Sequence, residues 1–218
     1  AEGYTIFKMH SAAQHDVIEQ TRAAQEVAPL GFKVHRDFNH NRPSTSVLRI
    51  IDELEQFSVV GFLEDPLYPY DIEGWRILRA KTSLPLLMHV PQLGGGPEIQ
   101  RDVADLYMIG EVGIGDSIRR GLAAAAAGLS TVVQLTGGTL CKALAMHLAA
   151  VMPNVSHSTN LDDQYAEDIS GGRLEISEGS TPVPEGPGLG VEVDEKILAE
   201  LSTRPKSELP RHLNVLSL

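Results

Sequence analysis

The chain is poor in the residues that mark several large classes of protein. Its 218 residues include one cysteine, Cys141, so no disulfide can form within the chain, and we expect a reducing, cytoplasmic compartment. No apolar run approaches the ~20 residues of a membrane span. The first residues also lack the composition of a signal peptide. We therefore expect no membrane partner.

Basic residues are in the minority, with 18 Lys and Arg against 29 Asp and Glu and a formal net charge of -11. A protein that binds nucleic acid needs a basic patch to neutralise phosphates, so we expect no nucleic acid partner. An acidic protein can still take an anionic substrate, because a bound metal ion reverses the sign of the local field.

The residues that are present favour one α/β domain. Hydrophobic residues make up 42% of the chain, enough for a sizeable core. Apolar runs typical of buried parallel strands alternate with helical periodicity, and strand ends recur roughly every 20 to 27 residues, the period of a βα unit. We predict strands over residues 5–10, 32–38, 59–63, 84–89, 106–109, 131–135 and 155–159, and helices over residues 14–28, 44–57, 72–81, 98–103, 117–127 and 140–152. These are about seven βα units, one short of a closed (β/α)8 TIM-type barrel.

Three of the predicted strands end in a charged or imidazole side chain, namely Asp37, Glu64 and His89. In a (β/α)8 barrel the functional groups lie at the carboxyl ends of the strands, so these residues are expected to share one site. The plainer interpretation of an acidic residue at such a place is a helix cap or a solvated loop residue.

Five short motifs, in their order along the chain, resemble those of one family. Residues 3–10 resemble a strand with a Lys-x-Lys base motif, residues 37–39 an Asp-x-Asn metal strand, and residues 64–66 a Glu-Glu-Pro metal strand. Residues 145–153 resemble the helix after a seventh barrel strand, and residues 184–190 an end segment. Together they resemble the barrel domain of the enolase superfamily, in its mandelate racemase and muconate lactonizing enzyme branch.

The resemblance implies a longer protein. Family members carry an N-terminal capping domain over the barrel mouth, and we expect this chain to lack that domain and the first barrel strand. We expect residues 1–218 to form one barrel domain, incomplete at the N-terminus, whose tail from about residue 161 to residue 218 packs on the barrel or on the missing domain. Within the tail, residues 173–176 are a strand candidate and residues 181–190 a rigid turn.

The resemblance also implies a divalent metal ion, with Mg2+ as the expected ion and Asp37 and Glu64 as two of three ligands. The third position departs from the family, which has a carboxylate where this chain has His89. Imidazole binds Mg2+ poorly and favours ions such as Mn2+ or Zn2+. Either His89 replaces the carboxylate and softens the metal preference, or metal binding is weak or lost. A His89 that is only hydrogen-bonded at the barrel rim is a further alternative.

Lys8 and His10 match the Lys-x-Lys motif, whose second residue in the family removes a proton α to a carboxylate. Residues two apart on a strand share a face, and an imidazole can act as a base near neutral pH, so Lys8 and His10 are catalytic candidates. The alternative for His10 is a polar residue at an exposed chain start.

The chain also differs from the family at the positions where many members have a second acid or base. The family often has a His where this chain has Gln134 and an Asp where it has Gly110 followed by Glu111, so the usual His-Asp pair is absent. Gln134 cannot transfer a proton, but its amide could bind substrate. His157 could replace the missing acid. Asn39 could touch substrate or metal, or simply form a turn.

These residues together predict metal-assisted chemistry on a small carboxylate, a hydroxy acid or sugar acid, in which a base removes the α-proton. The reaction is expected to be a dehydration or an isomerisation, and a one-base lyase reaction such as dehydration is favoured over racemisation, because the second base is altered. The alternative is a non-catalytic or ligand-binding homologue with a degraded metal site, and an unrelated phosphate-binding barrel is a third possibility. We also expect a homo-oligomer.

Overall fold

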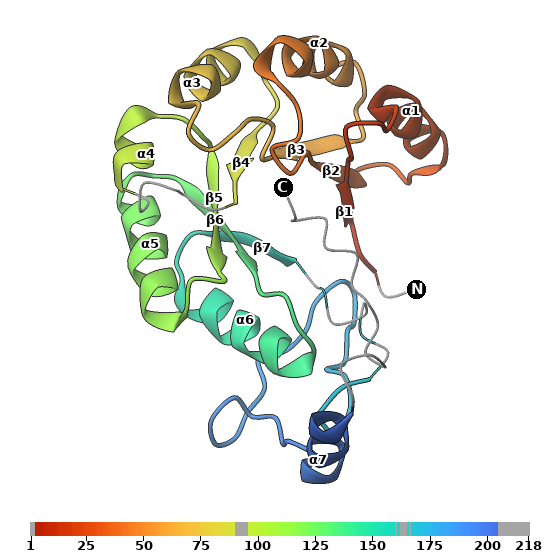
Figure 1. Ribbon diagram of the computed structural model, residues 1–218, viewed down its shortest axis with the longest axis vertical. Helices are drawn as coiled ribbons and strands as arrows, with labels where there is room; N and C mark the ends of the chain where they lie inside the picture. Colours follow the sequence, from red (N-terminus) through yellow and green to blue (C-terminus); the bar gives the residue numbers. More distant parts are fainter. Residues whose placement is uncertain (1–2, 90–95, 160, 162–164, 166, 205–218) are drawn as a thin grey trace.

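The computed structural model describes residues 3–89, 96–159, 161, 165 and 167–204, and its centre is one parallel sheet. Seven strands follow one another in chain order across the sheet, each hydrogen-bonded to the next (Figure 1). They are β1 (Ile6–His10), β2 (Lys33–Asp37), β3 (Val60–Glu64), β4 (Leu86–Met88), β5 (Leu106–Gly110), β6 (Ser130–Gln134) and β7 (Val155–Thr159). The predicted strands are therefore confirmed, with ends shifted by a residue or two.

Helices connect consecutive strands and surround the outer face of the curled sheet (Figure 1). They are α1 (Val17–Val27), α2 (Ser44–Leu54), α3 (Ile72–Lys81), α4 (Gly96–Arg101), α5 (Ile114–Ala126) and α6 (Thr139–Val151), and a further helix, α7 (Glu195–Thr203), lies in the tail. Asp16 and Asp71 cap α1 and α3, each with a side-chain oxygen that accepts a backbone N–H of the first turn. None of the described helices is long and apolar enough to cross a membrane.

The core lies on both faces of the sheet, because side chains of a strand alternate between them. On β5, Tyr107 and Ile109 pack under the helices, whereas Leu106 and Met108 belong to a smaller cluster with Leu87, Val132 and Phe62. This second cluster fills part of the interior of the curl. In a (β/α)8 barrel, too, layers of side chains from the strands fill the interior.

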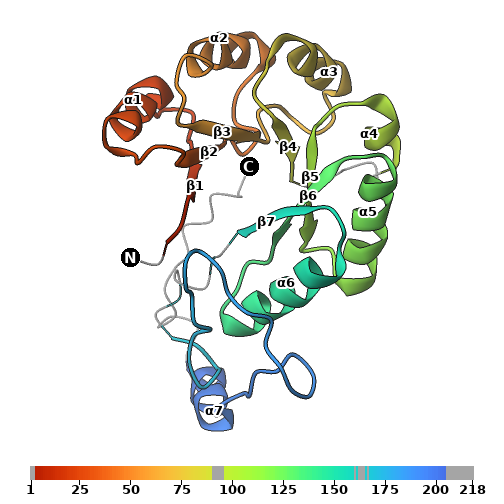
Figure 2. The ribbon, with the colours of Figure 1, turned by 180° about the vertical axis from the view of Figure 1, so that it is seen from behind.

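The sheet is a partial barrel rather than a closed one. β1 and β7 are its two edges, and they do not pair with each other. Both views show the curl open between these strands (Figures 1 and 2). The prediction of an incomplete TIM-type barrel is thus confirmed, with seven parallel strands and a helix after each of the first six.

The described part of the tail contacts α6. The Asp168 carboxylate accepts the backbone N–H of Thr139 at the start of α6, at 2.6 Å, and His147 on the same helix lies 3.2 Å from the carbonyl oxygen of Leu189. The assignment of the tail to the barrel domain stays a prediction, and its residues 205–218 lie outside the described part.

The prediction of a strand over residues 173–176 is wrong. The isolated bridges described near this segment are those of Ser170 with Val193 and of Ser177 with Ser180, and the second closes a tight turn over Glu178 and Gly179, both at positive φ. A segment that runs directly into such a turn pairs with no neighbouring strand among the described residues. Sequence reasoning also missed α7, although Asp194 begins it with a side-chain cap onto Lys196 and Ile197.

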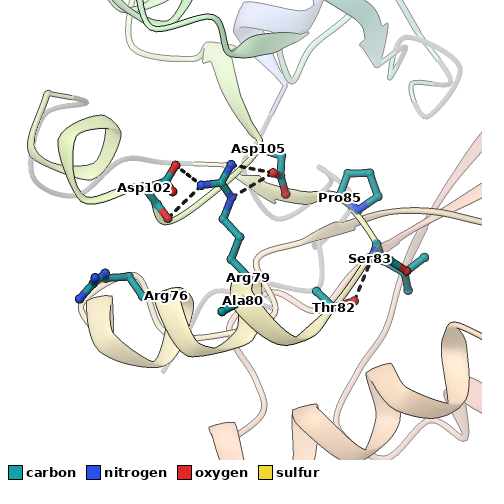
Figure 3. A pocket seen from close by; sticks show the side chains of 9 residues that line it. Arg76, Arg79, Ala80, Thr82, Ser83, Pro85, Asp102 and Asp105 are labelled. Atoms are coloured by element: carbon teal, nitrogen blue, oxygen red, sulfur yellow. Dashed lines mark hydrogen bonds and ion pairs between the residues drawn. The ribbon is translucent and has the colours of Figure 1, made fainter.

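A cluster of charged residues lies at the amino ends of β4 and β5. Arg79 of α3 binds Asp105 through Nε at 3.0 Å and also pairs with Asp102, at the edge of a cavity of about 590 Å3 (Figure 3). The other oxygen of Asp105 accepts the backbone N–H of Leu86 at 2.9 Å. Arg79 therefore connects α3 to the amino ends of β4 and β5.

Candidate active site

The predicted site residues meet at the opposite, carboxyl end of the sheet. His10 pairs in register with Asp37, and Asp37 with Glu64, so the ends of β1, β2 and β3 are level. Gly110 likewise pairs with Gln134. Level strand ends bring side chains that are far apart in sequence to one mouth.

Lys8 lies at the centre of this mouth. Its Nζ is 2.8 Å from Oε1 of Glu64, 3.2 Å from Oδ2 of Asp37 and 3.0 Å from Oε1 of Gln134. The side chains of Asp37 and Glu64 are each only 3% exposed. The two carboxylates therefore converge on one point, where a single cation serves both.

Lys8 and Asp37 both keep their charge although burial disfavours the charged forms. Burial works against the charged form of Lys8, but Glu64 and Asp37 outweigh it and raise the pKa of Lys8. Burial would raise the pKa of Asp37, but the hydrogen bond from His10 and the charge of Lys8 hold that pKa well below its usual range. Both groups are therefore ionised across the whole neutral range.

His10 lies at the outer rim of the mouth. Its side chain is 66% exposed, and its Nε2 is 3.0 Å from Oδ2 of Asp37. The structure therefore joins the two sequence candidates Lys8 and His10 through one carboxylate oxygen of Asp37.

His89 lies between two carboxylates. Its Nδ1 is 2.9 Å from Oε1 of Glu64, and its Nε2 is 3.1 Å from Oε2 of Glu111. Burial would lower the pKa of His89, but the hydrogen bonds to Glu111 and Glu64 raise it to about 10. The hydrogen bond from His89 in turn lowers the pKa of Glu111 to about 2. In the absence of another cation, His89 is an imidazolium that bridges the two carboxylates.

Sequence reasoning treated Glu111 only as the residue standing where the family has an Asp, and missed its contact with His89. Thr136, which was not singled out either, donates its hydroxyl to the other Glu111 oxygen at 2.8 Å. The available signal was the position of both residues one or two places beyond a predicted strand end.

Asp65 is a buried neighbour that positions two loops. It adopts a positive φ of 44°, and its oxygens accept the backbone N–H of His89 at 2.9 Å and approach Nε2 of His40 at 3.0 Å. Together with Glu64 and His89 it forms a group whose ligand atoms lie within 4.8 Å of one another. By accepting the His89 N–H, Asp65 also holds the loop that carries His89.

The donor atoms at the mouth have the chemistry that a divalent cation requires, and among the described residues the ligand atoms that lie within 4.8 Å of one another are those of Glu64, Asp65 and His89, without Asp37. Asp37 and Glu64 approach one Lys8 nitrogen, and Nδ1 of His89 lies against the same Glu64 oxygen. Two carboxylates and one imidazole are a mixed oxygen and nitrogen set, suited to ions such as Mn2+ or Zn2+ and less to Mg2+. Lys8 would compete with the ion for the same oxygens.

The remaining candidates lie at varying distances from this centre. The Gln134 amide oxygen accepts from Lys8, and its nitrogen lies 3.5 Å from Nε2 of His89. Asn39 is in a turn at a positive φ of 47°, and its backbone N–H donates to Asp37, which is what the turn-forming alternative predicts. His157 points into the sheet interior, where its ring centroid is 5.0 Å from that of His35.

His35 is a buried imidazole that sequence reasoning missed. It stacks on Phe62 at 4.2 Å between ring centroids. Burial lowers the pKa of His35 to about 3, and burial together with the charge of Lys8 lowers the pKa of His157 to about 4. Both rings are therefore neutral at physiological pH, below the charged mouth.

Comparison with known proteins identifies the family of the chain. Residues 1–90 and 98–197 match the model of the family described as enolase C-terminal domain-like. The chain therefore belongs to this family, in the mandelate racemase and muconate lactonizing enzyme branch of the enolase superfamily.

Relatives of the chain include dehydratases and cycloisomerases. D-gluconate dehydratase from Thermoproteus tenax is 30% identical over 158 residues, which are 68% of this chain and 32% of that protein. An isomerase from Streptomyces coelicolor A3(2) is 25% identical with a TM-score of 0.76, over 91% of this chain and 55% of the other. Muconate lactonizing enzyme from Pseudomonas putida shares the fold with a TM-score of 0.82 at 17% identity, over 91% of this chain and 58% of the other. The chain thus spans about a third of the curated relative and little more than half of these solved chains.

Proposed function

We propose that the chain carries the catalytic mouth of a metal-dependent enzyme that removes the α-proton of a small carboxylate, a hydroxy acid or sugar acid. The observation that carries the proposal is the convergence of Asp37 and Glu64 on one point, 3.2 and 2.8 Å from the same Lys8 nitrogen. In a member of this family, such a point at the strand ends is suited to a divalent cation.

In this proposal Asp37, Glu64 and His89 hold the cation, with Mn2+ or Zn2+ favoured by the imidazole and Mg2+ expected from the family. The bound ion would supply positive charge for the substrate carboxylate and for the negative charge that develops when the α-proton leaves. Residues 205–218 and 90–95, which lie outside the described part, have no role in the proposal.

His10 would take the proton. It is the most exposed of the imidazoles at the mouth, and its Nε2 is held 3.0 Å from Asp37, which orients the ring. Lys8 would offer its ammonium to the substrate carboxylate, since it is the one primary amine between the two acidic strand ends. Gln134 and Asn39 would bind substrate oxygen atoms, and His157, whose ring is neutral at physiological pH, could accept a proton below them but could not donate one as an acid.

The reaction is proposed to be a lyase reaction, with isomerisation as the neighbouring possibility. Gln134 stands at the strand end opposite Lys8 and cannot carry a proton, so a single base serves the mouth. Removal of a proton followed by loss of a β-hydroxyl needs one base and one acid, whereas racemisation needs a base on each face. The similarity to a dehydratase supports this choice.

The test is deuterium exchange in the full-length protein. With Mn2+ and a panel of hydroxy acids and sugar acids in D2O, we expect deuterium at the α-carbon or a dehydrated product, followed by NMR. His10→Asn should slow this 10²- to 10⁴-fold while metal affinity stays the same. His15→Asn, an exposed histidine five residues further on, is the matched control and should react as the parent does. An unchanged rate in His10→Asn would move the base to another strand end, with His157 next.

A ligand-binding homologue is the second candidate. It is favoured by one observation: Lys8 and His89 already provide positive partners for Asp37 and Glu64, so the mouth is electrostatically complete without an ion. Carboxylate binding without turnover, and without any effect of added Mn2+, Zn2+ or Mg2+, would favour this candidate over the enzyme.

A further inference from the structure

Glu111 connects the end of β4 to the end of β6. One of its oxygens accepts from Nε2 of His89 at 3.1 Å, and the other accepts from the hydroxyl of Thr136 at 2.8 Å. These donors come from two different strand ends, so the Glu111 carboxylate is fixed in place although its side chain is 34% exposed.

This arrangement determines which ring nitrogen of His89 keeps a proton. An ionised carboxylate can only accept hydrogen bonds, so the Nε2 that faces Glu111 carries hydrogen. The other nitrogen, Nδ1, lies 2.9 Å from Oε1 of Glu64. In the neutral ring, Nδ1 is then the atom whose lone pair faces the proposed cation position.

We propose that Glu111 is a positioning residue for metal binding: by accepting the Nε2–H of His89, it fixes the tautomer and orientation of the ring so that Nδ1 is presented to a divalent cation beside Glu64. The inference rests on the proposed function, because the cation is the one assigned there to Asp37, Glu64 and His89. A carboxylate behind a ligating imidazole also makes the ring a stronger ligand. Glu111 should therefore matter more for Zn2+ and Mn2+ than for Mg2+, which depends less on nitrogen.

A purely structural role for Glu111 predicts something different. A partly exposed ion pair at the rim would contribute to folding whether or not a metal is present, and its loss would not change which metal is preferred. Metal selectivity and the tautomer of His89 therefore separate the two roles.

The experiment compares metal affinity in four variants of the full-length protein by titration calorimetry. Glu111→Ala should weaken Zn2+ and Mn2+ binding about 10- to 100-fold, with a smaller change for Mg2+. Glu111→Gln, which keeps an acceptor oxygen, should recover part of the loss. Thr136→Val removes a donor to Glu111 without touching His89 and should give a smaller loss in the same direction. Glu73→Gln removes an exposed carboxylate on α3 and is the control that should change nothing.

A second readout follows His89 directly. In the Zn2+-loaded parent, long-range proton–nitrogen NMR should show His89 protonated at Nε2 and bound through Nδ1. In Glu111→Ala the ring should lose this fixed pattern. Circular dichroism checks that each variant is folded, and Thr136→Val carries the test if Glu111→Ala is not.

The outcomes separate the inference from the function on which it rests. A parent that binds none of the three ions would overturn the metal site and the inference together. A parent that binds Zn2+, with affinity and His89 signals unchanged in Glu111→Ala and Thr136→Val, would overturn the inference alone. An equally large loss for all three ions, matching that of Asp37→Ala, would make Glu111 a metal ligand and refute the positioning role.

Discussion

The two ends of the sheet carry the same charge motif in opposite surroundings. At the carboxyl end, Lys8 lies between Asp37 and Glu64, whose side chains are 3% exposed. At the amino end, Arg79 lies between Asp102 and Asp105, whose side chains are 77% and 34% exposed (Figure 3). Water can solvate the second pair of carboxylates but not the first.

This difference supports placing the proposed site at the mouth and not at the cavity beside Arg79. The cavity of about 590 Å3 lies beside Arg79, but the carboxylates there are exposed enough for water to solvate them. The mouth instead holds carboxylates that depend on a cation for their stability. Buried, converging charge is the better indicator of chemistry.

The largest expected effect is that of Lys8→Met. The variant leaves Asp37 and Glu64 buried without their ammonium, which should reduce the free energy of unfolding by about 3–5 kcal/mol. Added Mn2+ should restore much of this stability, since it replaces the lost positive charge, and it should bind the variant more tightly than the parent. Denaturant unfolding with and without Mn2+ measures both effects. A small loss that is insensitive to every divalent ion would mean that the carboxylates do not form a cation site.

The fold could be predicted from the sequence because its signals are local. Buried parallel strands are apolar runs, as Val60 to Glu64 is, and they recur at the period of a βα unit. α3 was predicted to the residue, since Asp71 caps it and Lys81 ends it. The tail was harder, because α7 buries none of its residues.

Only those residues of the proposed site that lie at strand ends could be predicted from the sequence. Asp37, Glu64 and His89 each follow an apolar run, so their shared position was predictable. The hydrogen bond between His89 and Glu111 depends on side-chain geometry across neighbouring strands, which no spacing encodes. The same holds for His35, which sits in mid-strand and is recognisable only from the rings packed against it.

A second effect is expected from pH. His35 and His157 have folded-state pKa values of about 3 and about 4, below the ~6.5 of an unfolded imidazole. Below pH ~6.5 the unfolded chain therefore takes up protons that the folded protein does not, and stability falls with pH by about 1.4 kcal/mol per unit for each imidazole until the folded-state pKa is reached.

This pH effect can be assigned to individual residues. His157→Gln and His35→Gln should each flatten the pH dependence of the unfolding free energy between pH 6.5 and 4. His15→Gln, at an exposed position, should leave the slope as in the parent. Chemical unfolding across this range provides the measurement, and parallel curves for all variants would contradict the assignment.

The smallest effect is expected at the amino end. Arg79→Met breaks the contacts with Asp102 and Asp105, but these carboxylates can be solvated, so the loss should be at most about 1 kcal/mol. This loss of unfolding free energy should be smaller still at high salt, because exposed charges are screened. Added Mn2+ should not change it. The same unfolding measurements as for Lys8→Met, made at low and high salt, compare the two ends directly. A loss as large as that of Lys8→Met would show that Asp105, which also accepts the Leu86 N–H, is effectively buried, and that the contrast between the two ends is smaller than their exposures indicate.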